Sequence, residues 1–144
     1  MLPLATIGYE GASQGAVIAK LAAAGVTLVL DVRAIAVSRR PGFSKTILAA
    51  SLAEAGIDYR HLRALGTPKA GRLAARAGRT DEMRAIYQAH LEEPDALGEL
   101  ALATDLANHR PCALLCYEAE ASRCHRSIVA ARICERIGCD VSDL

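Results

Sequence analysis

The chain has 144 residues, 52% of them hydrophobic, which suits one domain, residues 1–144, with a buried core. Aromatic residues make up 3% and Trp is absent, which argues against a surface that stacks single-stranded bases. The net charge of +1 argues against binding driven by overall charge. No apolar run is long enough to span a membrane, and the first residues do not read as a secretion signal. We therefore expect a cytoplasmic protein.

Short apolar runs alternate with helical patterns along the chain. The runs predict strands at 4–9, 26–32, 57–62 and 112–118, and the last residues predict a short edge strand. Helices are predicted after Ser13 and Ser44, at about 80–91 and 95–109, and after Ser122. Segment 63–80 carries Gly, Pro and basic residues with weak apolar spacing, and we interpret it as a long, mobile loop with at most one helical turn. The pattern predicts an α/β fold, a three-layer α/β/α sandwich with a mainly parallel, Rossmann-like sheet of about four to five strands.

The five cysteines lie in the last third of the chain, at 112, 116, 124, 134 and 139. Their number is odd, and no Cys-x-x-Cys pair occurs. For a reducing compartment this composition predicts free thiols and argues against a disulfide framework.

Charge is unevenly distributed. Segment 33–79 is basic, with only Glu54 and Asp58 opposing its Lys and Arg residues, whereas segment 80–122 is mainly acidic. This asymmetry favours an anionic ligand. It is equally compatible with two solvated faces of opposite sign.

Polar side chains collect where the predicted strands end. Because open α/β sheets bind ligands at the carboxyl ends of their strands, these residues are the candidates for a site. They are Glu10 after the first strand, Asp31, Arg33, Ser38 and Arg39 after the second, Glu118 after the fourth, and Cys124, His125 and Arg126 at the last helix.

Asp31 directly follows an apolar run, so its carboxylate needs a partner such as Arg33 or Arg39. Either Asp31 forms an ion pair that shapes the loop, or it acts as a general base or accepts a ribose hydroxyl. Glu118 is a second candidate for the general acid or base.

Cys124 falls in the first turn of the last helix if Ser122 is its cap. The helix dipole and the neighbouring Arg123, His125 and Arg126 would then lower its thiol pKa and favour a thiolate nucleophile. The same environment would equally bind phosphate, with Cys124 as an inert neighbour.

A metal site is a further reading of Cys116, Glu118, Cys124 and His125. The spacing matches no standard zinc pattern. Adjacent residues on a helix also point about 100° apart, so Cys124 and His125 would not converge. We therefore expect no metal, and the sequence indicates no cofactor.

Several stretches, taken together, resemble the DUF488 family of bacterial and archaeal proteins. They are "TIGYEG" (6–11), "GVTLVLDVR" (25–33), "SRRPGFSK" (38–45), "GIDYRHLRALG" (56–66) and "LLCYEAEASRCHRSIVA" (114–130). The resemblance implies a small α/β domain and marks Gly8, Asp31, Arg33, Ser38, Arg39, Phe43, Ser44, Cys116, Glu118, Cys124, His125 and Arg126. Where relatives often have Pro, this chain has "AIA" at 34–36, which implies a softer loop. The resemblance implies a fold and a site without naming a reaction.

The leading hypothesis is an enzyme that acts on a phosphate-bearing substrate, a nucleotide or a nucleic acid at the strand ends. Arg33, Arg39 and Arg126 would hold phosphate, while Asp31, Glu118, Cys124 and His125 would be catalytic. One alternative is a non-catalytic nucleotide or nucleic-acid binding module. Another is a thiol-based redox or sensor protein that uses Cys124. The expected partner is thus an anionic small molecule or nucleic acid and not a membrane.

Overall fold

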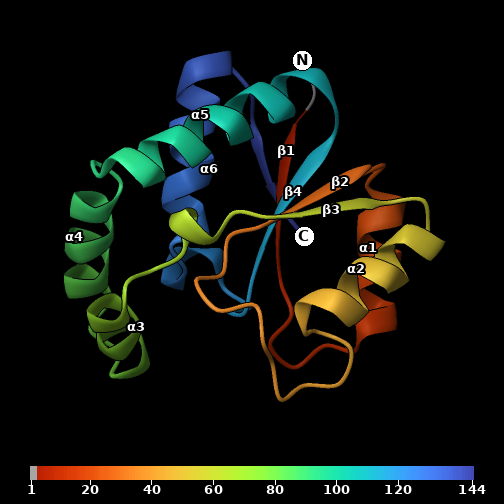
Figure 1. Ribbon diagram of the computed structural model, residues 1–144, viewed down its shortest axis with the longest axis horizontal. Coiled ribbons are helices and arrows are strands. Elements are labelled where there is room, and N and C mark those ends of the chain that lie inside the picture. The colour runs from red at the N-terminus through yellow and green to blue at the C-terminus, as the bar shows by residue number, and fades with distance from the viewer. Residues whose placement is uncertain (1–2) are drawn as a thin grey trace.

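A computed structural model describes residues 3–144 and contains one parallel sheet in the strand order β3-β2-β4-β1-β5 (Figure 1). The strands are β1 Leu4–Gly8, β2 Leu28–Asp31, β3 Asp58–His61, β4 Cys112–Cys116 and β5 Val141–Asp143. All pairings between neighbouring strands are parallel, which confirms the predicted Rossmann-like α/β class. The predicted edge strand at the end of the chain is β5, which pairs with β1.

The burial of each strand explains its composition. The central strands β2 and β4 are buried along their whole length, because helices cover both faces of the sheet. Continuous apolar sequence is therefore required there. The edge strands β3 and β5 lack this constraint, and their residues are exposed or half-buried.

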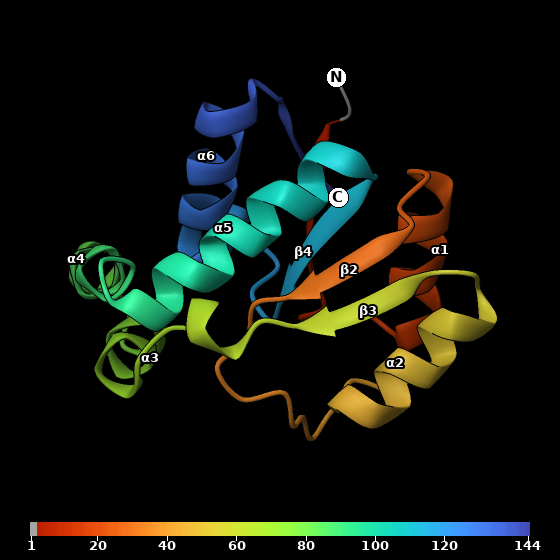
Figure 2. The same cartoon turned by 45° about the horizontal axis from the view of Figure 1, so that its top comes forward.

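Six helices accompany the strands in the described part of the chain. They are α1 Gln14–Ala23, α2 Lys45–Glu54, α3 Lys69–Arg76, α4 Thr80–His90, α5 Pro94–His109 and α6 Arg126–Ile137. Figure 2 shows α1 and α2 on one side of the sheet and α5 and α6 on the other. Two apolar cores result, one built from α1 and α2 and the other from α4, α5 and α6, each against one sheet face. The predicted three layers are thus present.

The loop predicted at 63–80 is wrong, because this segment contains a 3-10 turn, Arg63–Leu65, followed by α3. The helix buries only the small residues Gly71 and Ala74. Its charged residues Lys69, Arg72 and Arg76 recur at helical spacing, so a helical signal was present beside the Gly, Pro and basic residues that indicate a loop. Gly71 is needed for this packing, since a Cβ there would lie 2.5 Å from the methyl carbon of Thr67. α3 and α4 lie side by side beyond the end of the sheet (Figures 1 and 2).

The predicted start of the last helix is also wrong. A 3-10 turn, Ala121–Arg123, intervenes, and Cys124 after it is extended, with φ −118° and ψ 145°. α6 begins only at Arg126, so Cys124 does not lie in its first turn. Elsewhere the predicted cap of α1 is confirmed, because Ser13 Oγ accepts a hydrogen bond from the backbone N–H of Ala16 at 3.1 Å.

Across residues 3–144, none of the helices has the length and apolar character needed to cross a membrane.

The end of β1 depends on a close approach between two backbones. A Cβ added at Gly8 would lie 1.7 Å from the carbonyl oxygen of Glu118, whereas one added at Gly98 of α5 meets nothing within 4 Å. Gly8→Ala should therefore lower the free energy of unfolding by at least about 1–3 kcal/mol, because the backbone must move. Gly98→Ala should raise it by about 0.5–1 kcal/mol, because alanine favours a helix interior. Thermal unfolding of both variants checks this, and equal stabilities would contradict the close approach.

Candidate functional site

A cavity of about 410 Å³ opens at the carboxyl ends of the strands. Its wall combines the loop after β2, the helix pair α3–α4, the segment after β4 and the residues just before α6. Six of the residues predicted for the site line it, namely Arg33, Ser38, Arg39, Glu118, Cys124 and His125. The other three, Glu10, Asp31 and Arg126, lie outside its lining.

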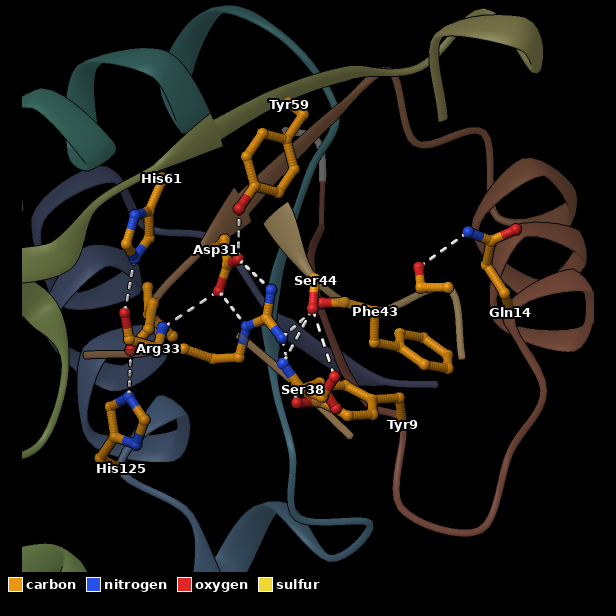
Figure 3. A network of polar contacts seen from close by, with 12 residues as sticks. Tyr9, Gln14, Asp31, Arg33, Ser38, Phe43, Ser44, Tyr59, His61 and His125 are labelled. Carbon is orange, nitrogen blue, oxygen red and sulfur yellow. Dashed lines mark hydrogen bonds and ion pairs between the residues drawn. The ribbon is translucent and has the colours of Figure 1, made fainter. Parts of the chain in front are cut away.

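Asp31 lies beneath the cavity wall in an ion pair. Its carboxylate is fully buried and accepts two hydrogen bonds from the guanidinium of Arg33, 2.9 Å from Nε to Oδ1 and 2.7 Å from Nη2 to Oδ2, and a third from the backbone N–H of Arg33 to Oδ1 at 3.1 Å (Figure 3). The hydroxyl of Tyr59 also donates to Oδ2. Both carboxylate oxygens are engaged, which favours the loop-shaping role of Asp31 over contact with a ligand.

Arg33 uses its remaining donors on the protein as well. Its Nη1 donates to the hydroxyl of Tyr9 at 3.0 Å and to the carbonyl of Phe43 at 2.8 Å. Burial opposes the charge on Arg33, but the hydrogen bonds and charge of Asp31 outweigh it and raise the pKa of the guanidinium above its ordinary value. Arg33 is therefore a permanent cation that ties β1 and the 34–44 loop to β2.

The backbone that follows β2 orients two histidines. His125 Nε2 lies 2.6 Å from the carbonyl oxygen of Val32, and His61 Nε2 lies 2.7 Å from that of Arg33 (Figure 3). A carbonyl only accepts, so Nε2 of His125 carries the proton and Nδ1 keeps a lone pair. Nδ1 lies 3.5 Å from Cys124 Sγ. Burial lowers the pKa of His125 to about 4, which keeps the imidazole neutral at neutral pH.

The expectation of free thiols is met only at Cys112 among the described residues. Cys116 and Cys124 form one disulfide and Cys134 and Cys139 form a second. Burial raises the pKa of the Cys112 thiol to about 11. The cysteine count alone could not show this pairing, because β4 and the turn before α6 bring Cys116 and Cys124 together only in the folded chain. Cys116 ends the buried strand β4 and lies with Cys124 on the floor of the cavity.

Arg126 lies behind this floor and is almost fully buried. Its Nη1 donates to Cys116 Sγ at 3.0 Å and to the carbonyl of Glu118, and its Nη2 donates to the carbonyl of Ala119 at 3.2 Å. Nε has no hydrogen-bond partner, and no carboxylate within residues 3–144 forms an ion pair with the guanidinium. Burial lowers the pKa of Arg126, and the charges of Asp143 and Glu118, which form no ion pair with it, only partly oppose that shift.

Among residues 3–144, Glu118 is the one carboxylate that lines the cavity. Burial and the nearby charge of Glu10 raise its pKa, and Arg126, Arg123 and Arg76 partly oppose that shift. Glu10 itself is exposed, and its carboxylate accepts a hydrogen bond from the backbone N–H of Ala119 at 3.1 Å. Glu10 thus holds the segment after β4.

The helices α3 and α4 provide a wall of the cavity that was not predicted from the sequence. Thr67, Arg72, Ala75, Arg76 and Met83 line the cavity from there. Treating 63–80 as a loop concealed them, although Arg72 and Arg76 have the i, i+4 spacing that places side chains on one helix face.

The cavity is strongly basic. Besides Arg33 it is lined by Arg39, Arg72, Arg76 and Arg123, against the single carboxylate of Glu118. Within residues 3–144, Arg39, Arg72 and Arg76 form no ion pair with a carboxylate, whereas Arg123 lies 3.4 Å from Glu120. The charges of Arg39, Arg72 and Arg76 are therefore not neutralised by a carboxylate of the described chain.

The fold and the lining residues define an open α/β protein with a cavity at the carboxyl ends of its strands, where such folds bind ligands. The chain belongs to the family described as Domain of unknown function DUF488, whose sequence model matches residues 13–133. The matched range contains every predicted site residue except Glu10, and it confirms the resemblance. No curated protein and no solved structure matches the chain.

The buried ion pair yields a prediction about stability. Asp31→Asn should lower the free energy of unfolding by about 3–5 kcal/mol, because it leaves the charge of Arg33 buried without a counter-charge. Asp58→Asn is the matched control, since Asp58 is exposed and pairs with Arg110 at 2.9 Å on the surface. Its loss should cost about 0–1 kcal/mol. Urea unfolding of both variants measures the difference, and a similar small loss in each would contradict the role given to Asp31.

Proposed function

We propose that this protein is an enzyme whose strand-end cavity binds a phosphate-bearing anion, either a small molecule such as a nucleotide or a nucleic-acid end. The observation that carries the proposal is the excess of guanidinium groups around one concave space. Four arginines besides the ion-paired Arg33 line a cavity of about 410 Å³, with one carboxylate among them. That volume lies within the usual range for small-molecule sites, about 300–1,000 Å³.

The chemistry of the lining supports phosphate as the recognised group. Guanidinium groups match phosphate oxygens with paired hydrogen bonds, and a recessed site strengthens these contacts relative to open water. Arg39 comes from the loop after β2, and Arg72 and Arg76 come from α3, so the ligand would be held from more than one wall. Ser38 beside Arg39 supplies a hydroxyl on the same wall.

The reactive groups of the cavity support an enzyme over a simple binding module. Glu118 has a raised pKa, and the neutral His125 points its free nitrogen at Cys124. Perturbed titratable groups that face a cavity are typical of catalytic sites. We assign the general acid or base role to Glu118, because Asp31 is enclosed by its ion pair, and we place the reacting end of the ligand next to Cys124 and His125.

Arg33 and Arg126 receive a different role from the phosphate-binding one first expected. Both use their donors on protein atoms, Arg33 on Asp31 and Arg126 on backbone carbonyls and Cys116. We propose that they shape the wall and floor of the cavity and add positive charge at short range.

Binding of inorganic pyrophosphate, followed by isothermal titration calorimetry, tests the anion site. Arg39→Ala and Arg76→Ala should each weaken binding by about tenfold to a hundredfold, because a hydrogen bond to a charged group contributes about 1.5–3 kcal/mol. Affinity should also fall as salt is added. Arg60→Ala is the matched control, since Arg60 is exposed on β3, outside the cavity lining.

Two outcomes would reject the anion site. One is the absence of pyrophosphate binding by the unaltered protein at low salt. The other is an equal loss of affinity in Arg60→Ala, which would show that overall charge and not the cavity attracts the anion.

A separate measurement addresses catalysis. With a phosphate ester that the protein converts under reducing conditions, where Cys124 is a thiol, Cys124→Ser should remove turnover and leave the affinity for pyrophosphate within about twofold, because the cavity arginines stay in place. Unchanged turnover would remove the Cys124 sulfur from the reaction.

A further inference from the structure

We propose that Cys116, Cys124 and His125 form a zinc site on the floor of the cavity when the two cysteines are reduced. The three donor atoms, two Sγ atoms and a ring nitrogen, all lie within 4.8 Å of one another and come from buried residues. Two thiolates and an imidazole are soft and borderline donors, a set that favours Zn²⁺ over oxygen-preferring ions such as Mg²⁺ and Ca²⁺.

Helix geometry does not keep the side chains of Cys124 and His125 apart. Adjacent residues point about 100° apart only within a helix, whereas Cys124 is extended and α6 begins only after His125. Their side chains converge as a result, with 3.5 Å between Cys124 Sγ and His125 Nδ1. Two ligands at about 2.3 Å (sulfur) and 2.0–2.1 Å (nitrogen) from one tetrahedral ion have a separation of about this length.

The protein fixes His125 in the form a metal requires. Its Nε2–H donates to the carbonyl of Val32 at 2.6 Å, which leaves the Nδ1 lone pair toward the sulfurs. Imidazoles that bind metals nearly always donate their other N–H to a carbonyl or carboxylate in this way. A histidine that only packed in the core would not need a lone pair beside the sulfur of Cys124.

Arg126 supplies an independent argument for thiolates at this place. The guanidinium is buried, has no carboxylate partner within residues 3–144, and donates to Cys116 Sγ at 3.0 Å. A neutral disulfide gives this cation little compensation, whereas a metal-bound thiolate gives it a charged acceptor.

The spacing of the backbone leaves room for an ion. The Cα atoms of Cys116 and Cys124 are 7.5 Å apart, beyond the range of about 4.4–6.8 Å usual for disulfides. In Cys134–Cys139 the same distance is 4.6 Å. In the Cys116–Cys124 pair, a metal ion can therefore lie between the two sulfurs while the backbone keeps its position.

Metal binding requires reduction of the Cys116–Cys124 disulfide. A thiol reductant donates two electrons and two protons to the Cys116–Cys124 disulfide, giving two thiols, and is itself oxidised to a disulfide. Zinc then displaces the two thiol protons, because only thiolates bind the metal. The disulfide form and the zinc form thus exclude each other.

The site has three protein ligands, and no further Cys, His, Asp or Glu within residues 3–144 joins the cluster. Three protein ligands with an open fourth position are typical of catalytic zinc, whereas structural zinc has four. All three residues line the cavity, so the open position faces it. This last step rests on the proposed function: bound zinc would act there as a Lewis acid on a water molecule or an anionic oxygen of the ligand.

Zinc uptake by the reduced, metal-free protein tests the site, measured by competition with a chromophoric chelator under anaerobic conditions. The reduced protein should bind about one ion per chain, and the oxidised protein should bind none. Cys116→Ser, Cys124→Ser and His125→Gln should each weaken binding by more than about 100-fold, since loss of an outer partner alone costs about 10–100-fold. Cys112→Ser and Cys134→Ser are the matched controls and should bind as the unaltered protein does.

Cobalt substitution provides a measurement that does not depend on whether the variants fold. Co²⁺ in the reduced protein should give thiolate charge-transfer absorption in the near ultraviolet and the visible bands of a tetrahedral ion. No uptake of either metal by the reduced protein would overturn the proposal. So would zinc that is lost equally in Cys134→Ser, because the ligands would then lie at the other cysteine pair.

Failure of the zinc site and failure of the anion site are distinguishable. Pyrophosphate binding is measured on the oxidised, metal-free protein, where only the arginines act. Zinc uptake is measured without any phosphate. Either result can fail while the other holds.

Discussion

The short turn at the end of β2 holds the candidate site together. Asp31 and Arg33 neutralise each other inside the protein, and the carbonyls of Val32 and Arg33 each accept a hydrogen bond from a histidine. A buried charge is costly unless it is paired and hydrogen-bonded, so the Asp31–Arg33 pair strongly favours one arrangement of this turn. Through it β1, the 34–44 loop, β3 and the start of α6 are joined at one point (Figure 3).

Close backbone contacts also hold the loop after β2, which forms part of the cavity wall. A Cβ at Gly66 would lie 2.2 Å from the backbone of Ala34, so the segment before α3 presses directly on the loop after β2. The backbone N–H of Lys45 donates to the carbonyl of Ala36 at 2.8 Å, and Ser38 N–H donates to Ser44 Oγ at 3.0 Å. These contacts fall on the "AIA" stretch and the residues beside it, and they hold the loop in the absence of a proline.

Much of the fold was predictable, because parallel strands buried on both faces require apolar runs and helices between them require a periodic face. The strands, the helices at 80–90 and 94–109, and the gathering of polar groups at the strand ends follow from those two rules. α3 was not predicted, because the Gly, Pro and basic residues of 63–80 indicate a loop, although its charged residues have helical spacing. The geometry at Cys124 did not follow either, since a 3-10 turn displaces the helix start and only the folded chain brings Cys116 near.

The role of Asp31 shows why site residues are harder to predict than site location. The sequence shows that Asp31 follows a strand. Whether its carboxylate faces a ligand or a neighbouring arginine depends on the backbone conformation of the two residues that follow it. Cys116 is the opposite case. A small residue at the end of a buried strand indicates core packing, and only the folded chain shows that Arg126 and Cys124 contact its sulfur.

The two proposals are physically linked through the charge of the cavity floor. Reduced cysteines without a metal, if ionised by the neighbouring Arg126, would add negative charge beside the proposed phosphate and oppose its binding. Zinc bound to two thiolates cancels that charge and leaves the surrounding arginines in excess. A ligand that prefers the zinc form must, by thermodynamic reciprocity, also tighten zinc binding by the same factor. On this assignment Arg126 is the residue that connects the two events, because it stabilises the thiolate of Cys116 with one nitrogen and holds the carbonyls of Glu118 and Ala119 at the cavity wall with both.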